Sequence, residues 1–166
     1  MNNEILVVFV TNNVYFPKMT TAKEFDLQDF LPYLLNQAAD ASSLEFQRYY
    51  KAHYGMLRTE WRVIFHLGRY GKMTAKEICV RARMHKTKVS RAVAALEAKR
   101  FLTRNEFPDD RRHEELSLTR AGQSAYADLS VQAKRFDEKL LSKLPAENLK
   151  VLRSSLRQIA GFSEYK

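Results

Sequence analysis

The sequence predicts a mainly α-helical protein with one small β-ribbon. From residue 27 onward, apolar residues recur at steps of three and four, which is the spacing of amphipathic helices. Two short stretches, 101–107 and 114–118, depart from this spacing and flank a polar turn that starts at Pro108. A chain of 166 residues is about one domain and can bury a core without disulfides or a structural metal.

The first part of the chain differs from the rest. Residues 1–22 contain two Asn pairs, Pro17 and an apolar run from Ile5 to Val10. We expect an N-terminal extension that is either disordered or an additional strand. The apolar run is too short to cross a bilayer, and no other apolar stretch approaches membrane-spanning length. We therefore expect no membrane partner.

The next segment, 23–56, is predicted to be helical. Pro32 is tolerated only in the first turn of a helix, so the helix is expected to start near Asp29 and to end at Gly55. A second helix is predicted from Thr59, as its N-cap, to about Gly68.

Four more elements complete the helical pattern. Thr74 and Glu77 form a capping box that opens a short helix to about Arg83, and another helix runs from about Lys86 to Lys99. After the ribbon, Thr119 caps a helix from about Arg120 to Leu144, and Pro145 is placed at the first position of a last helix. That last helix carries an apolar stripe at Leu149, Leu152, Leu156 and Ile159.

This order of elements predicts a winged helix-turn-helix over residues 57–119. The flanking segments, 23–56 and 120–166, have broad apolar stripes and few other elements to cover them, so we expect them to pair two copies into a homodimer.

The positive charge is concentrated in the same central segment. Residues 57–120 hold 16 Lys and Arg against 8 Asp and Glu, whereas the remaining residues hold 12 against 11. A localised basic segment favours binding to a polyanion, because neutralising phosphates releases counterions. We therefore expect double-stranded DNA as a partner.

The helix starting at Lys86 is the candidate that reads DNA. Val89, Ala92, Val93 and Leu96 fall on one side of it. The other side is small, polar and basic, as a major groove requires, because Arg can fork onto guanine and Ser or Thr can bond base edges or phosphate. The predicted DNA-binding residues here are Lys86, Thr87, Lys88, Ser90 and Arg91.

The tip of the ribbon supplies a second basic element. Arg111 and Arg112 are predicted to bind DNA, because an arginine can insert into a narrow minor groove, and Asp110 is predicted to orient the Arg112 guanidinium. The alternative is an exposed turn whose local ion pairs contribute less than about 1 kcal/mol.

Three segments carry a resemblance to the MarR family of bacterial transcription regulators. They are LRTEWRVIFHLGRYGKMTAKEI from Leu57, MHKTKVSRAVAALEAKRFLTR from Met84, and DDRRHEELSLTRAG from Asp109. The resemblance implies a homodimer, a recognition helix in the major groove and a wing arginine in the minor groove. It also implies a repressor that small aromatic or phenolic ligands release, with a ligand pocket near the first two helices. Arg48, Tyr49, His53 and Trp61 gather there and either line such a pocket or pack in the core and interface.

Other classes of function have less support. The chain has no Gly-rich phosphate loop, nucleophile elbow, HExxH or paired CxxC, so we expect neither an enzyme nor a cofactor or metal site. His85 is expected to touch phosphate, cap a helix or be solvated. The single cysteine, Cys79, is expected to be a buried small hydrophobe and fits a cytoplasmic location. The remaining alternative is an architectural protein that coats DNA through phosphate contacts alone.

Overall fold

The computed structural model describes residues 25–107 and 110–162, without the side chains of 106, 107 and 110–113. The predicted N-terminal extension therefore lies outside the described residues. The chain divides into two compact units, Met1–Gln37 and Ala38–Lys166. In the first unit a 3-10 turn, Leu27–Asp29, precedes a long helix that begins at Leu31 with Pro32 in its first turn. The predicted roles of the segments stay predictions: dimerisation for 23–56 and 120–166, and DNA binding for 57–119.

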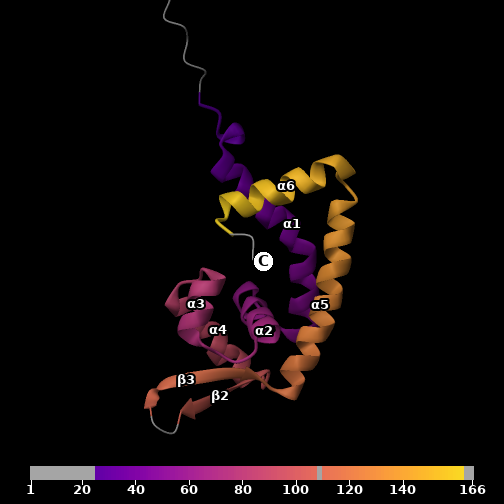
Figure 1. The fold of residues 1–166 in the computed structure, drawn as a ribbon. Helices are drawn as coiled ribbons and strands as arrows, with labels where there is room; N and C mark the ends of the chain where they lie inside the picture. The colour runs from indigo at the N-terminus through magenta and orange to yellow at the C-terminus, as the bar shows by residue number, and fades with distance from the viewer. Residues whose placement is uncertain (1–24, 108–109, 163–166) are drawn as a thin grey trace, which may run out of the picture. The chain divides into compact units, whose positions relative to one another are not determined.

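The mainly helical fold with a small β wing is confirmed (Figure 1). The elements are α1 (Leu31–Tyr54), α2 (Arg58–Tyr70), β1 (Met73–Thr74), α3 (Ala75–Ala82), α4 (Lys86–Ala98), β2 (Leu102–Phe107), β3 (Asp110–Leu118), α5 (Arg120–Leu141) and α6 (Ala146–Ile159). Helix α4 follows α3 after a short connection and leads directly into the β2–β3 ribbon.

The wing is part of a three-stranded antiparallel sheet in the order β1-β3-β2. The sequence did not predict β1, because its two residues overlap the capping box at Thr74 and are too few to show a strand period. The predicted start of the second ribbon strand at Glu114 was also wrong, since β3 begins at Asp110. The ladder resumes beyond a register shift between Glu106 and Phe107, which the polar composition of this stretch does not reveal.

Two predicted boundaries of the second helix were wrong. Thr59 is not its N-cap, because α2 begins at Arg58 and Leu57 occupies the cap position without a side-chain hydrogen bond. The helix also continues past Gly68 to Tyr70 and ends at Gly71, whose φ of 81° suits glycine. Gly68 has a packing role instead, since a Cβ there would lie 2.4 Å from the Tyr126 ring.

The C-terminal helices differ slightly from prediction. Helix α5 ends at Leu141 rather than at Leu144. Pro145 occupies the N-cap position of α6, because its ψ of 137° is extended rather than helical. The predicted cap at Thr119 is confirmed, and its side chain accepts the N–H of Gly122. The capping box at Thr74 and Glu77 is confirmed as well.

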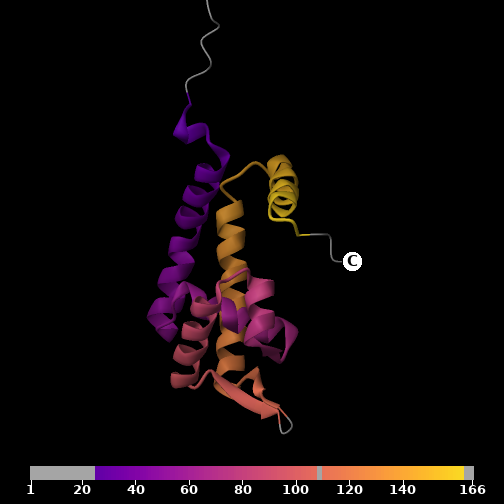
Figure 2. The same cartoon turned by 90° about the vertical axis from the view of Figure 1, so that its left-hand side faces the viewer.

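One core spans the helix-turn-helix, the sheet and the facing part of α5. Its largest fully buried side chains include Ile64 of α2, Ile78 of α3, Leu96 of α4, Leu116 of β3 and Leu129 of α5. Figures 1 and 2 show α2, α3 and α4 gathered beside the sheet, with α5 leading away from it toward α6. In the described part of the chain, none of the helices is long and apolar enough to cross a membrane.

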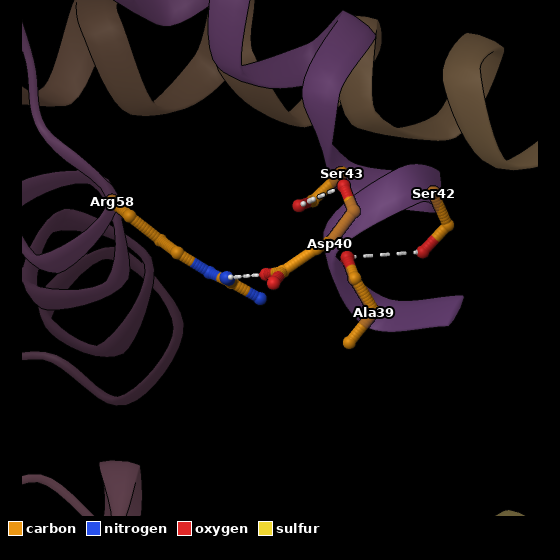
Figure 3. A network of polar contacts seen from close by, with 5 residues as sticks. All are labelled: Ala39, Asp40, Ser42, Ser43 and Arg58. Carbon is orange, nitrogen blue, oxygen red and sulfur yellow. Dashed lines mark hydrogen bonds and ion pairs between the residues drawn. The ribbon is translucent and has the colours of Figure 1, made fainter. Parts of the chain in front are cut away.

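The start of α2 is tied to α1 within the second unit. The Arg58 guanidinium donates to the Asp40 carboxylate at 3.0 Å, as Figure 3 shows. Ser42 and Ser43 donate back to the carbonyls of Ala39 and Asp40, which is a common bond for hydroxyls inside a helix. Both partners of the Arg58–Asp40 pair are exposed, so the pair contributes little to the stability of the fold.

Candidate nucleic-acid interface

Helix α4 begins with a histidine cap. His85 has extended backbone angles, and its Nδ1 accepts the N–H of Thr87 at 3.3 Å. Capping is therefore one role of His85 among those left open by the sequence. The cap places Lys86, Thr87 and Lys88 in the first turn, where a helix presents its free N–H groups.

The two faces of α4 divide as the periodicity predicted. Val89, Ala92, Val93 and Leu96 are buried against the core. All five residues predicted to bind DNA from this helix are exposed: Lys86, Thr87, Lys88, Ser90 and Arg91. Ala94 is exposed on the same helix and leaves room for a close approach.

The exposed cations of α4 are not neutralised within the described part of the chain. None of the described carboxylates forms an ion pair with Lys86, Lys88 or Arg91. Unpaired, exposed cations on one helix face create the positive potential that attracts phosphates.

An ion pair with one buried partner anchors the other end of α4. The Lys99 ammonium, directly after the helix, binds the carboxylate of Glu60 and also donates to the Gly55 carbonyl at 2.7 Å. Glu60 is 3% exposed and lies in the first turn of α2. Sequence reasoning missed this pair, although Glu60 shares the inward spacing of Ile64 and Leu67 on α2.

Charged side chains also join α2 to α3. Arg62 donates to the carbonyl of Ala82 at the end of α3, and Arg81 of α3 lies over the Tyr70 ring at 4.6 Å. His66 stacks on the same Tyr70 ring. Burial, and then the nearby charges of Arg62 and Arg81, lower the pKa of His66 below its ordinary value of 6.5. These contacts hold α3 in place behind α4.

The wing meets α4 through Arg104. This side chain on β2 donates to Glu97 at the end of α4 and to Glu114 on β3. The backbone of residues 110–113 continues β3 toward the tip. The side chains of the predicted contacts Arg111 and Arg112, and of Asp110, lie outside the described residues, so their roles stay predictions.

The four residues predicted to contact an effector have different surroundings. His53 stacks on Tyr49 at 4.0 Å between ring centroids, and Trp61 packs edge-on against Phe46 and other rings of the core. Arg48 is exposed. A hollow of about 330 Å³ between α1 and α5 has one of the four, Tyr49, in its lining; the other lining residues are Glu45, Phe46, Gln132, Arg135, Phe136 and Lys139.

Two tyrosines of α1 share one carboxylate of α5, which the sequence did not predict. The hydroxyls of Tyr49 and Tyr54 both donate to one Asp128 oxygen, at 2.9 and 2.7 Å. Burial and the bond to Asp128 raise the pKa of Tyr54 to about 12, and the same bonds lower the pKa of Asp128. Asp128 lacked a sequence signal because its partners are more than 70 residues away.

Cys79 is half-buried and packs against the core. It is therefore less buried than the sequence predicted. Among the residues that the structure describes, no group of three or more His, Cys, Asp or Glu is placed to hold a metal ion.

The fold and this surface define a class of protein. One face of α4 is buried in the core, the other is exposed and basic, and a β-ribbon follows. This arrangement is a winged helix-turn-helix of the kind that binds DNA.

Comparisons with known proteins identify the class further. The MarR family model matches residues 54–113. An uncharacterised HTH-type transcriptional regulator of Bacillus subtilis, YwoH, is 27% identical over 95 residues, which cover 57% of this chain and 69% of YwoH. The chain is also similar to the MarR family transcriptional regulator SPO1453 of Silicibacter pomeroyi, with a TM-score of 0.68, 26% identity, and 82% and 99% of the two chains covered.

Two further solved structures share the fold at lower identity. One is S. aureus MepR in complex with DNA, with a TM-score of 0.71, 16% identity, and 83% of this chain and 98% of that chain covered. The other is the PcaV regulator of Streptomyces coelicolor in complex with its natural ligand, with a TM-score of 0.70, 19% identity, and 84% and 98% covered. The family-model match and the similarity to YwoH and SPO1453 confirm the resemblance to the MarR family seen in the sequence, and MepR and PcaV share the fold.

Proposed function

We propose that this protein is a cytoplasmic, sequence-specific repressor that binds a palindromic operator as a homodimer and is released by a small aromatic effector. The observation that carries the proposal is the exposed face of α4, on which Lys86, Lys88 and Arg91 have no carboxylate partner among the described residues. A face of this kind supports readout of a major groove. MepR, which shares the fold, has been solved with DNA bound.

The homodimer follows from the apolar side chains that each chain leaves exposed on its terminal helices. In α6 these include Leu152, Leu156 and Ile159, at 40%, 40% and 56% exposure. Two-fold symmetry would place the two α4 helices about 34 Å apart, one turn of DNA. The operator would then have matching half-sites.

The test is fluorescence anisotropy with duplex DNA from the protein's own upstream region beside a scrambled duplex, across a salt series. We expect a preference of about 10³-fold or more for the native duplex. Arg91→Ala should weaken specific binding by about 10-fold or more and relax base preference, since it removes a base contact. Lys134→Ala, an exposed lysine on α5, is the matched control for loss of one charge and should change little.

Equal binding to native and scrambled duplexes would favour the architectural alternative, because phosphate contacts alone carry no base preference. If the Arg91→Ala and Lys134→Ala variants bind the native duplex with equal affinity and equal base preference, the assignment of α4 as the reading helix is wrong.

The effector is proposed to be an aromatic or phenolic acid. Arg135 lines the hollow between α1 and α5 beside the Phe46 and Phe136 rings and has no ion pair among the described residues, whereas Lys139 is paired with Glu45 at 2.6 Å and the Tyr49 hydroxyl donates to Asp128. PcaV, which shares the fold, has been solved with its natural ligand. Release requires that the acid bind the DNA-free state more tightly than the DNA-bound state. Repeating the anisotropy titration with salicylate tests this, and unchanged DNA affinity at millimolar salicylate would count against an effector of this class.

A further inference from the structure

Arg104 is the one described side chain that bridges α4 and both strands of the wing through ion pairs. It belongs to β2, its Nε donates to Glu97 Oε2 at 2.9 Å, and its Nη1 donates to Glu114 Oε2 at 2.7 Å. Glu97 lies in the last turn of α4, and Glu114 lies on β3.

The geometry of this bridge suits orientation. A guanidinium is a rigid planar fork, so two bonds in different directions fix the angle between the groups that it joins. The nearby contact between Asn105 and Ser117, at 3.1 Å, joins β2 only to β3 and does not reach α4. Arg104 is thus placed to set the tilt of the wing against α4.

Two other roles of Arg104, a large contribution to stability and a contact with a phosphate, explain its bonds less well than orientation of the wing does. Its side chain is 33% exposed, and its partners are 43% and 42% exposed, and pairs this open contribute little to stability. The guanidinium is also committed to two carboxylates, and their bonds raise its pKa further. The two carboxylates offset its positive charge, so the cluster attracts a phosphate less than an arginine without such partners would.

We propose that Arg104 is a positioning residue that holds the wing at one angle to α4, so that Arg112 reaches the minor groove while α4 lies in the major groove. The inference rests on the proposed DNA-binding function. Arg112 is two residues before Glu114 on the same strand, so a change at Glu114 is transmitted over a short length of backbone. Losing the bridge would cost the wing contact and spare the contacts of α4.

A double-mutant cycle tests this coupling. Arg104→Met keeps the apolar stem and removes both ion pairs, and we expect operator affinity to fall by about 10-fold with an unchanged melting temperature. In an Arg112→Ala background the same substitution should cost less than about 2-fold, because the wing contact is already lost. In an Arg91→Ala background it should keep its full effect. Additive losses with Arg112→Ala would overturn the proposal.

Two carboxylate substitutions on β3 separate positioning from simple charge. Glu114→Gln and Glu115→Gln each remove one negative charge at neighbouring positions, but Glu115 pairs with Lys72 instead of Arg104. If Arg104 only masks negative charge from DNA, both variants should bind operator more tightly. We expect Glu114→Gln to weaken binding and Glu115→Gln to leave it unchanged or stronger.

Tighter binding by Glu114→Gln would overturn the positioning role while leaving the proposed function intact. A wild-type protein that binds neither native nor scrambled duplex would instead overturn the proposed function, and the inference with it.

Discussion

Gly122 is the residue at which the first turn of α5 packs directly against the backbone of Phe101. Thr119 caps α5 by accepting the Gly122 N–H at 3.1 Å and donates its hydroxyl to the Arg100 carbonyl at 2.7 Å. This draws the first turn of α5 onto the backbone before β2. A Cβ at position 122 would lie 1.9 Å from the carbonyl oxygen of Phe101. Glycine is required here for close approach, although its φ is unremarkable.

Gly122→Ala is therefore expected to destabilise the fold by about 2 kcal/mol or more, because the obstructing atom is backbone and cannot rotate away. Gly55→Ala is the matched control, since Gly55 has a φ of 59° and no atom lies within 4 Å of the position that a Cβ would take there. That variant should cost only about 1 kcal/mol of backbone strain. Urea unfolding of both variants measures the difference, and equal losses would contradict the close-packing explanation.

Helix α4 and the wing are two elements held as one reading surface. His85 caps the start of α4, and Lys99 anchors its end to buried Glu60. Arg104 then joins the last turn of α4 to β3. An element fixed at both ends loses little conformational entropy when it binds, which favours affinity.

The wing's own contribution is predicted through Arg112. Arg112→Ala should weaken operator binding and make the salt slope shallower by about 1, because one phosphate-neutralising cation is lost. The measurement is the same anisotropy titration across salt concentrations. A slope equal to that of the wild-type protein, with equal affinity, would show that the tip of the wing does not contact DNA.

At the scale of the described chain, α6 is one of the helices whose apolar side chains a single copy leaves exposed. Its apolar stripe is exposed, and its ties to the rest of the second unit are polar, such as the Arg153–Asp137 pair at 2.8 Å and the weak Arg83 bond to the Gly161 carbonyl. Apolar area of this extent is usually covered by a partner.

We expect the double substitution Leu152→Arg and Leu156→Arg to yield a monomer, because it places two cations in the proposed interface. Binding to the full operator should then fall to that of a single half-site. Ser154→Glu, on the opposite side of α6, is the control and should remain a dimer. Light scattering on the purified proteins measures the mass, and a dimer that survives the double substitution would place the interface elsewhere.

Periodicity predicted the parts of the fold that local rules control. The buried face of α4, the capping box at Thr74 and Glu77, and the cap at Thr119 follow from spacing within a few residues. The errors at Thr59, Gly68 and Glu114 arose at element ends, where tertiary contacts decide how far a helix or ladder continues. The candidate DNA-reading face was predictable because it lies on one helix.

The sequence alone was enough for the order of the helices, the position of the ribbon and the exposed basic face of α4, because each depends on a short repeat or a local cap. Only the tertiary structure decided the Lys99–Glu60 anchor, the Arg104 bridge and the Asp128 bonds to Tyr49 and Tyr54. Those contacts join residues of different elements, and one polar side chain can pair with many distant partners until the packing of the core selects one.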